Sequence, residues 1–260
     1  MKYAKKSLGQ NFLIDKNIIN KIINLIKVEN RNIIEIGPGK GALTDEILNR
    51  KPKSLILIEK DKFLSDKLKS RYLNFPSVKI LNEDILNFDI EKNLLQDSVV
   101  FGNLPYNISS QILVKFLRFK KWPPKFKNLI FMFQKELGEK IVGKFKTKNY
   151  GRLSILTNYK LKFKEKFFVS AGCFFPKPKV TSVVIHFIPK DNSRHNQNNI
   201  EKLEKLTNIF FSNRRKMINK NILKILKYED IKKLKYLDMR SRPEEIRPEI
   251  YYKLLKFIEN

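Results

Sequence analysis

A glycine-rich turn near the start of the chain is the strongest local indication of chemistry. The apolar run Ile33–Ile36 leads into a turn that contains Gly37, Gly39 and Gly41, and Ala42–Arg50 then has helical periodicity. Glycine lets a ligand approach the backbone closely, and the first turn of a helix offers unpaired N–H donors. Gly37, Gly39 and Ala42 also satisfy G-x-G-x-x-[GA], the pattern of dinucleotide sites. By itself this turn predicts a site for a nucleoside-containing cofactor, with a tight structural turn as the alternative.

Polar side chains end the next three apolar runs at regular intervals. Glu59 lies 22 residues after Gly37, Asp84 lies 25 residues after Glu59, and Asn103 lies 19 residues after Asp84. These intervals fit successive strand–helix units, so we expect the four loops to meet at the carboxyl edge of one sheet, where such folds bind ligands. Glu59 could then accept hydrogen bonds from both hydroxyls of a ribose, and Asp84 from the exocyclic amine of an adenine. Taken separately, these two residues would be ordinary solvated loop acids.

The loop Asn103-Leu104-Pro105-Tyr106 presents hydrogen-bond acceptors beside an aromatic ring. Pro105 stiffens the turn and lacks a backbone N–H. The Asn103 side-chain oxygen and the Pro105 carbonyl could accept both N–H groups of a planar amine while Tyr106 stacks on its ring. This would aim the lone pair of a weak amine nucleophile without a general base of shifted pKa, and the loop has neither His nor Cys. The alternative is a β-turn with a core tyrosine.

The elements that must position these loops alternate between β-branched runs and stretches of helical periodicity. Alternation of this kind indicates βαβ units, and therefore an α/β fold with a parallel sheet covered by helices. The expected strands are Asn32–Ile36, Ser54–Ile58, Val78–Leu81, Ser98–Phe101, Asn128–Phe133, Lys162–Val169 and Val180–Ile188. Expected helices follow Asp15 and cover Ala42–Arg50 and Lys62–Tyr72. We find no internal repeat.

A polar stretch near residue 190 divides the chain. Lys190–Asn199 is rich in Asn and lacks apolar periodicity, so we interpret it as a linker. Beyond it, Ile200–Phe211, Met217–Leu226 and Ile250–Ile258 have helical spacing without strand signals. We therefore expect one domain over residues 1–190 and a small all-helical domain over residues 191–260.

The charge of the chain predicts a polyanionic partner. Its 260 residues carry a formal net charge of +28 at pH 7, and residues 115–179 hold 18 basic and 3 acidic side chains. A surface of this kind attracts nucleic acid or an anionic membrane, and the aromatic residues between the cations favour nucleic acid because bases can stack on them. A second basic group, Arg214-Arg215-Lys216, lies in the expected helical domain. The alternative is a compositional bias toward Lys, Asn and Ile.

Cysteine and histidine usage and the apolar runs exclude several classes. With one cysteine and two histidines, the chain has no intramolecular disulfide and no zinc cluster of familiar spacing, so no metal is expected. No apolar stretch approaches the roughly 18 residues that span a bilayer, and the basic N-terminus lacks the apolar segment of a signal peptide. We expect a cytoplasmic protein that does not enter a membrane.

Seven groups of residues along the chain carry a resemblance to a known family. They are Asn11-Phe12-Leu13, Glu35-Ile36-Gly37-Pro38-Gly39, Glu59, Asp84, Asn103-Leu104-Pro105-Tyr106, Tyr150-Gly151-Arg152-Leu153-Ser154 and Phe174-Phe175-Pro176-Lys177-Pro178-Lys179-Val180. In this order and spacing they resemble the S-adenosylmethionine-dependent rRNA adenine N6,N6-dimethyltransferases. Within these, the resemblance is strongest to the bacterial 16S enzymes, the kasugamycin-resistance group. It extends from Leu8-Gly9-Gln10-Asn11 to Arg214-Arg215-Lys216.

The resemblance implies a Rossmann-like methyltransferase domain that binds S-adenosylmethionine. The cofactor-binding residues it implies are Asn11, Leu13, Gly37, Gly39, Glu59, Asp84 and Asn103. The first two would cover the cofactor, the glycines would admit its methionine part, and the two acids would hold its ribose and its adenine.

The resemblance also implies a catalytic set and a substrate. The catalytic residues would be Asn103, Pro105, Tyr106 and Phe174, with Phe174 stacking on the second face of the target base. The implied substrate is a pair of adjacent adenines near the 3′ end of 16S rRNA, dimethylated at N6 by a monomer acting on the small ribosomal subunit or its precursor. The sequence departs from the family at Ser110-Gln111, where Thr-Pro is common, at Thr181, where Asp is common, and in the final helices.

Three other functions share part of this pattern. A 23S rRNA adenine methyltransferase of the antibiotic-resistance type has the same cofactor motifs. A non-catalytic RNA-binding assembly factor could keep the fold, although intact Glu59, Asp84 and Asn103–Tyr106 argue against lost catalysis. An NAD-dependent oxidoreductase would need a proton-transfer residue near the site, and the sequence shows none. This function would also leave the large positive charge of the chain unexplained.

Overall fold

The computed structural model describes residues 10–191, 197–234 and 237–258. The basic N-terminus and Leu8-Gly9, which take part in the resemblance, lie outside the described residues. The chain forms two compact units, which we describe separately. The first comprises residues 1–115, 124–138 and 163–189, and the second comprises residues 116–123, 139–162 and 190–260. This division differs from the single boundary expected after residue 190, because two earlier segments cluster with the C-terminal helices.

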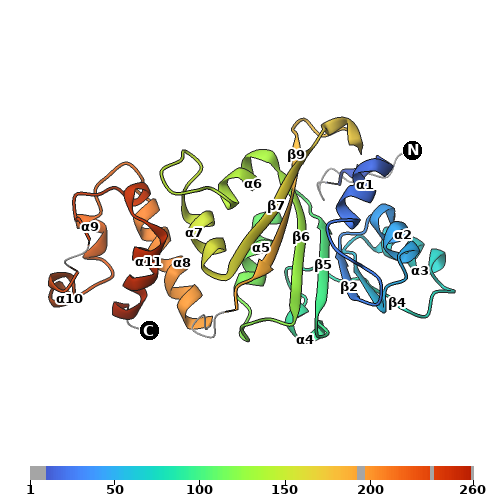
Figure 1. Ribbon diagram of the computed structural model, residues 1–260, viewed down its shortest axis with the longest axis horizontal. Helices are drawn as coiled ribbons and strands as arrows, with labels where there is room; N and C mark the ends of the chain where they lie inside the picture. Colours follow the sequence, from blue (N-terminus) through green and yellow to red (C-terminus); the bar gives the residue numbers. More distant parts are fainter. Residues whose placement is uncertain (1–9, 192–196, 235–236, 259–260) are drawn as a thin grey trace. The chain divides into compact units, whose positions relative to one another are not determined.

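A seven-stranded sheet organises the first unit (Figure 1), and its order is β4-β3-β2-β5-β6-β9-β7. The strands are β2 (Asn32–Ile36), β3 (Ser54–Ile58), β4 (Val78–Leu81), β5 (Ser98–Asn103), β6 (Phe126–Gln134), β7 (Leu161–Val169) and β9 (Ser182–Pro189). Strands β2 to β6 pair in parallel, and β9 is antiparallel to β6. The α/β fold expected from the sequence is confirmed, and β2, β3 and β4 have the expected bounds.

The register of the parallel strands brings their carboxyl ends level. Ile36 pairs with Ile58 on one side and with Gly102 on the other, and Ile58 pairs with Leu81. The chain leaves β2 and β5 in opposite directions along the sheet, so the edge between them is a topological switch point, where open α/β sheets bind ligands. The loops that follow β2, β3, β4 and β5 therefore start side by side.

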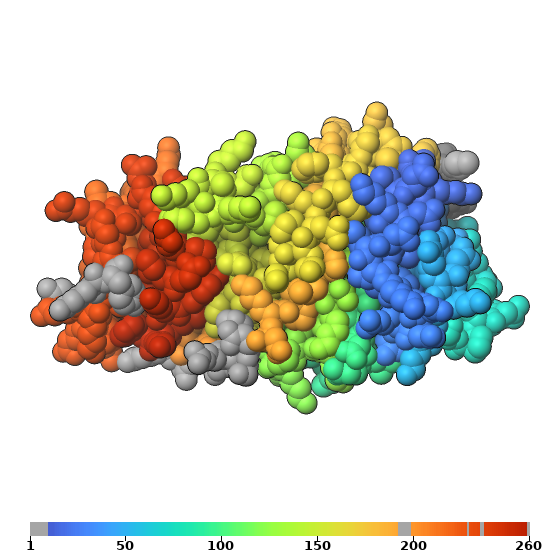
Figure 2. All heavy atoms as spheres, in the orientation of Figure 1, coloured from blue at the N-terminus to red at the C-terminus, as the bar shows by residue number. Residues whose placement is uncertain are grey.

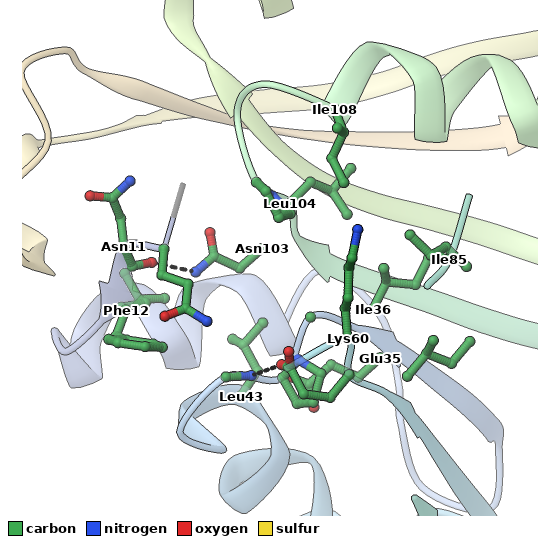
Figure 3. Close-up of a pocket in the computed structure, with 18 of the residues that line it drawn as sticks. Asn11, Phe12, Glu35, Ile36, Leu43, Lys60, Ile85, Asn103, Leu104 and Ile108 are labelled. Atoms are coloured by element: carbon green, nitrogen blue, oxygen red, sulfur yellow. Dashed lines mark hydrogen bonds between the residues drawn. The ribbon is translucent and has the colours of Figure 1, made fainter. Parts of the chain in front are cut away.

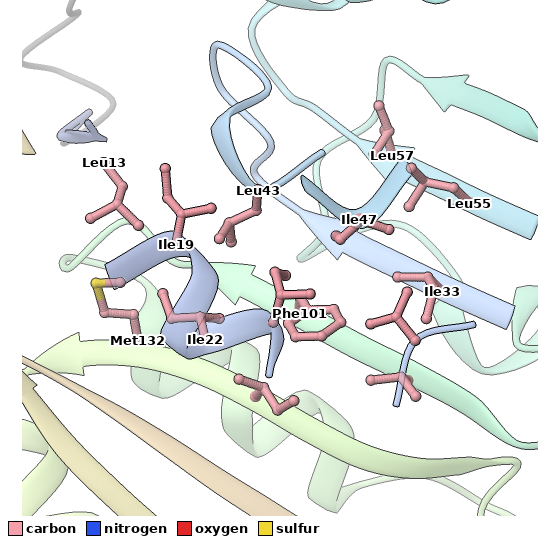
Figure 4. Packing of buried hydrophobic residues seen from close by; sticks show 14 of the residues in the cluster. Leu13, Ile19, Ile22, Ile33, Leu43, Ile47, Leu55, Leu57, Phe101 and Met132 are labelled. Atoms are coloured by element: carbon pink, nitrogen blue, oxygen red, sulfur yellow. The ribbon is translucent and has the colours of Figure 1, made fainter. Parts of the chain in front are cut away.

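Helices on one face of this sheet bury a hydrophobic cluster against it (Figure 4). They are α1 (Lys16–Ile23), α2 (Ala42–Asn49) and α3 (Lys62–Arg71). The side chains of Ile22, Ile47 and Phe101 meet in this cluster, and each is at most 2% exposed. Asp15 caps α1 by accepting from the Ile18 N–H, and an aspartate at this position satisfies an otherwise unpaired donor. The other unit-one helices are α4 (Ile90–Asn93), α5 (Ser109–Leu117) and α6 (Lys135–Ile141), of which the last two continue into the second unit.

A second, two-stranded sheet joins segments that are far apart in the sequence. Strand β1 (Phe12–Leu13) pairs antiparallel with β8 (Phe174–Phe175), which follows a 3₁₀ turn over Ala171–Cys173. In Figure 2 the blue N-terminal part of the chain lies against the gold segment that contains β8. This pairing holds the N-terminal segment beside the edge of the large sheet.

The second unit is mainly helical. Its elements are α7 (Arg152–Lys160), α8 (Gln197–Phe211), α9 (Asn219–Ile222), α10 (Tyr228–Lys232), α11 (Pro248–Leu254) and 3₁₀ turns over Pro243–Glu245 and Leu255–Phe257. Helix α8 begins inside the stretch expected to be a linker, and the helix expected over Met217–Leu226 is confined to α9. Arg118 and Glu204 form a two-pronged ion pair within this unit. Over the described parts of the chain, no helix combines the length and apolar character needed to cross a membrane.

Candidate active site

One pocket lies at the carboxyl edge of the large sheet and receives the loops of four strands (Figure 3). It contains about 1150 Å³ of open space, its mouth included. Nine of the ten residues singled out from the sequence line it: Asn11, Leu13, Gly37, Gly39, Glu59, Asp84, Asn103, Pro105 and Tyr106. The apolar walls are formed by side chains such as Ile36, Ile85 and Leu104. A largely apolar cavity with a few converging polar groups is typical of a small-molecule site.

The glycine-rich turn forms the floor of this pocket. Gly37 and Gly39 have φ angles of +68° and +59°, which L side chains rarely adopt. A Cβ on Gly39 would lie 2.9 Å from Cδ1 of Phe12, whose ring packs directly on the turn. Glycine at these positions allows this backbone conformation, and at Gly39 the missing Cβ also makes room for the Phe12 ring. The Gly39 N–H donates to Oε2 of Glu59 over 3.0 Å, so the turn is also fixed to the end of β3.

Two buried carboxyl groups lie behind the turn. Glu59, which is 6% exposed, accepts from the N–H of Gly39 and, through Oε1, from the N–H of Asp61. Burial raises the pKa of Glu59, and these two backbone hydrogen bonds act in the opposite direction. Glu35 is 1% exposed and accepts from Thr44 Oγ1 over 2.6 Å. Burial raises the pKa of Glu35 to about 8, with a smaller contribution from the nearby charge of Glu59.

Asp84 forms an ion pair with a neighbouring lysine inside the pocket. Its Oδ2 accepts from Nζ of Lys60 over 2.7 Å, and its Oδ1 accepts from the N–H of Leu86 over 3.0 Å. Partial burial alone would raise the pKa of Asp84, but these two hydrogen bonds hold it below its usual value. Figure 3 shows the Lys60 side chain extending into the cavity, in the region of Ile85. The acid expected to contact an adenine is thus charged and already paired.

Asn103 is oriented by the N-terminal segment. Its Nδ2 donates to the backbone carbonyl of Asn11 over 3.1 Å, as the dashed line in Figure 3 shows. A carbonyl oxygen only accepts, so the Asn103 atom that faces it must be the nitrogen, and the amide orientation is fixed. Within the described residues, Oδ1 of Asn103 has no hydrogen-bond partner and is available as an acceptor in the pocket.

Hydrogen bonds fix Pro105 and Tyr106, the other two site residues of the Asn103–Tyr106 loop. The Pro105 carbonyl accepts from the N–H of Ile108 over 3.1 Å, which leaves it a second lone pair. The Tyr106 hydroxyl lies 2.5 Å from Oγ of Ser182 on β9. Burial raises the pKa of Tyr106, and Ser182 opposes this shift, so the phenol stays neutral. The Tyr106 ring is therefore fixed at the pocket wall by a strand that is distant in the sequence.

Phe174 differs from the other nine residues, because it does not line the pocket. Phe174 is 3% exposed and belongs to the hydrophobic cluster under α1 and α2, together with Leu13, its partner across the β1–β8 pair. Opposed residues of an antiparallel pair lie on the same face, and successive residues alternate between faces. The neighbouring Phe175 is therefore the aromatic residue that faces outward, and it is 43% exposed. A stacking role for Phe174 has no support in this arrangement.

Two residues of the site were not singled out from the sequence. Lys60 follows Glu59 directly, but a lysine after a strand is normally a solvated residue, and nothing in the sequence pairs it with Asp84. Ser182 lies 76 residues from Tyr106, so their contact depends on the pairing of β6 with β9. Neither residue belongs to a local motif that would have indicated its role.

Comparison with known proteins agrees with this geometry. The family model described as ribosomal RNA adenine dimethylase matches residues 1–260. The chain belongs to this family. A dimethylase-family relative from Pelagibacter ubique, named ribosomal RNA small subunit methyltransferase A, is 41% identical over 258 residues, which cover 99% of this chain and 97% of the relative. A relative of the same name from Mycoplasmopsis synoviae is 43% identical over 217 residues, 84% of this chain and 81% of the relative.

Solved structures place the dimethylase family within a broader fold. A dimethyladenosine transferase from Plasmodium falciparum is 27% identical, has a TM-score of 0.79, and is matched over 95% of this chain and 97% of its own. The 23S rRNA methyltransferase ErmE is 22% identical with a TM-score of 0.66, over 96% of this chain and 100% of its own, and shows similarity of fold alone. The Rossmann-like methyltransferase fold and the enzyme class expected from the resemblance are confirmed.

Proposed function

We propose that this chain transfers methyl groups from S-adenosylmethionine to N6 of adenines in 16S rRNA. By our proposal, the target is two adjacent adenines near the 3′ end, dimethylated on the small ribosomal subunit or its precursor. We further propose that the chain acts in the cytoplasm as a monomer. Family membership and the two relatives named as small subunit methyltransferases support the 16S target over the 23S alternative.

The observation that carries the proposal is the position of the Asn103–Tyr106 loop. Its acceptors line the same pocket as the glycine turn and the acids of β3 and β4, so an amine held by the loop would lie next to a cofactor held by the other three. A dinucleotide enzyme or a binding protein would have no need of a free amide oxygen at Asn103 in this pocket.

The residues around the pocket fit S-adenosylmethionine. Glu59 has lone pairs beyond those used by the backbone and can accept from ribose hydroxyls, and the apolar walls near Ile85 suit a purine. Asp84 would accept from the adenine amine once Lys60 moves aside. Gly37 and Gly39 line the pocket, so the methionine part would lie against their backbone. When bound, this cofactor supplies a methyl group on a positively charged sulfur, which is an activated leaving group.

The chain's own contribution to the reaction would be orientation of the nucleophile. In the first transfer, Oδ1 of Asn103 would accept one N6 hydrogen and the Pro105 carbonyl the other; in the second, the one remaining hydrogen would be held by one of these two acceptors. The nitrogen lone pair would then be directed toward the cofactor instead of being delocalised into the ring. Tyr106 would stack against the base, and its hydroxyl, bound to Ser182, would prevent the ring from rotating away. Each transfer would form an N6–methyl bond as the sulfur–methyl bond breaks, and the proton released from N6 would pass to water, because the loop has no residue that acts as a base. Positioning of this kind accounts for most of the rate.

The proposal is tested on small subunits that lack the modification. The subunits are incubated with the purified chain and labelled S-adenosylmethionine, and the labelled nucleotides are mapped. We expect label on N6 of adjacent 16S adenines. The change Asn103→Ala should lower kcat by about 100-fold or more, the loss usual when one preorganised polar group at the reacting atoms is removed. The matched control is Asn49→Ala, at an exposed asparagine on α2 outside the pocket.

Three outcomes would refute this account. Label in 23S rRNA would support the antibiotic-resistance alternative, and cofactor binding without any methyl transfer would support a non-catalytic assembly factor. Turnover by Asn103→Ala close to that of the unaltered chain would show that this amide does not orient the nucleophile.

A further inference from the structure

The rim of the pocket carries an exposed aromatic residue that the proposed chemistry does not use. The register of the β1–β8 pair places Phe12 opposite Phe175. Phe12 is 7% exposed because it packs on the glycine turn, whereas Phe175 is 43% exposed. A single exposed ring is common on protein surfaces, so the reason to consider Phe175 as a ligand contact is its position opposite Phe12, which lines the pocket.

A lysine from the glycine turn lies against the same pair of rings. Nζ of Lys40 is 4.7 Å from the centroid of Phe12 and 5.9 Å from that of Phe175. Lys40 is exposed, and within the described parts of the chain its ammonium has no carboxylate partner. Its backbone is fixed, since its carbonyl accepts from Nη1 of Arg71 over 3.0 Å. We call Phe12, Lys40 and Phe175 the rim platform.

The chemistry of the rim platform fits single-stranded RNA. Bases stack on exposed aromatic rings, and cations beside such rings neutralise the adjoining phosphates. The residues that follow Phe175 add further positive charge, because Lys177 and Lys179 are also exposed. An apolar peptide would instead require a groove, and the rim platform offers one open ring beside the ammonium group of Lys40.

The position of the rim platform identifies which nucleotide would reach it. Phe12 and Lys40 line the pocket that also contains the Asn103–Tyr106 loop. A base that enters this pocket must leave its stack, and its neighbours in the strand then remain at the mouth without a stacking partner. The rim platform lies where such a neighbour would be left.

We propose that the rim platform binds the nucleotide next to the target adenine. The base of that nucleotide stacks on Phe175, and Lys40 contacts its phosphate. This inference rests on the proposed function in taking RNA as the substrate and in placing its target adenine in this pocket. It assigns no part of catalysis to Phe175 or Lys40.

The test compares the rim platform with a matched pair elsewhere on the first unit. Phe63 on α3 is 42% exposed, and Nζ of Lys67 lies 4.4 Å from its ring centroid, so the pair has similar exposure and chemistry but does not line the pocket. The variants are Phe175→Ala and Lys40→Met, with Phe63→Ala and Lys67→Met as controls. The probe is a short single-stranded RNA with two adjacent adenines flanked by 2-aminopurine, whose fluorescence falls when it stacks. Phe175→Leu keeps the apolar volume without the aromatic face, in case the alanine variant folds poorly.

Binding is followed by fluorescence anisotropy at several salt concentrations. One lost base–aromatic stack is worth about 1–3 kcal/mol, so Phe175→Ala and Phe175→Leu should raise the Kd for RNA by about 5- to 150-fold and relieve the 2-aminopurine quenching. Lys40→Met should reduce the slope of log affinity against log salt by about 0.7, the value for one single-strand phosphate contact. The affinity for S-adenosylhomocysteine should stay unchanged in all variants.

The outcomes separate this inference from the proposed function. If Phe175→Ala bound RNA with the same affinity and the same 2-aminopurine quenching as the Phe63→Ala control, the proposed role of the rim platform would be refuted, whatever the chain methylates. A loss of S-adenosylhomocysteine affinity in Lys40→Met would also overturn it, by assigning the lysine to the cofactor. Failure of methyl transfer with an intact platform effect would instead refute the proposed function alone.

Discussion

Removal of the Lys60 charge should tighten binding of the demethylated cofactor. In the structure the ammonium of Lys60 occupies Oδ2 of Asp84, the acid proposed to accept from the adenine amine. Adenine must therefore displace an existing contact before it gains its own. The change Lys60→Met removes the charge and keeps an apolar stem of similar length for packing against the purine.

The magnitude follows from the exposure of the ion pair. The Lys60 side chain is 54% exposed and that of Asp84 is 21% exposed, so the pair is largely hydrated. Ion pairs of this kind contribute about 0.2–1 kcal/mol, and the gain in affinity should be about 1.4- to 5-fold. Salt weakens the ion pair in the unaltered chain, so the difference between the two proteins should shrink as ionic strength rises.

Calorimetric titration with S-adenosylhomocysteine at low and moderate salt measures this effect. The control is Lys92→Met, which removes an exposed lysine paired with Asp89 over 3.0 Å outside the pocket and should leave the affinity unchanged. A fall in affinity for Lys60→Met would refute the reasoning, because it would show that the ammonium assists the adenine. An equal gain in cofactor affinity for Lys92→Met would show that the effect comes from the lower net charge of the chain and not from the Lys60–Asp84 pair.

Two further predictions concern the floor of the pocket. Gly39→Ala should lower the free energy of unfolding by roughly 1–3 kcal/mol, measured by urea denaturation, because of the positive φ and the 2.9 Å approach of Phe12; Gly172→Ala, whose Cβ would be no closer than 3.8 Å to its neighbours, should be nearly neutral. Folding raises the pKa of Glu35 from 4.5 to about 8, so the folded chain holds a proton that the unfolded chain releases. The stability gained from this bound proton is complete below pH 4.5 and is lost as the pH rises toward 8. Between these two pH values, the free energy of unfolding of the unaltered chain should therefore fall relative to that of Glu35→Gln, by up to about 1.4 kcal/mol per pH unit. A difference that does not vary with pH would contradict the burial argument.

Local patterns were sufficient to predict the part of the site that lies on consecutive strands. Strands β2, β3 and β4 end where their apolar runs end, and the site residues follow within three positions: Gly37 and Glu59 directly, and Asp84 three residues after Leu81. Regular spacing between Gly37, Glu59, Asp84 and Asn103 predicted that the four loops share one edge, and all four residues line one cavity. Each of these inferences depends on a short segment and on the general geometry of parallel sheets.

Contacts between segments that are distant in the sequence could not be predicted from local patterns. Strands β1 and β8 have two residues each and lie some 160 positions apart, so no periodicity indicates that they pair. Which of Phe174 and Phe175 faces outward depends entirely on that register. Helix α7 was missed for a different reason, since six of its nine residues are buried and it has no polar face to produce an amphipathic pattern.

The hydrogen-bond acceptors of the site differ in whether they already have a partner in the structure. This difference affects how the site selects its ligands. Both oxygens of Glu59 accept from backbone N–H groups, and both oxygens of Asp84 accept from Lys60 or from the Leu86 N–H. Cofactor binding at these acids therefore exchanges or shares hydrogen bonds, so its net gain in free energy is modest while its demand on geometry is high. Oδ1 of Asn103 is different, because the contact with Asn11 fixes the amide and leaves this oxygen open. The acceptor that would meet the nucleophile is thus the one prepared in advance, which is the condition for an interaction that favours the transition state over simple binding.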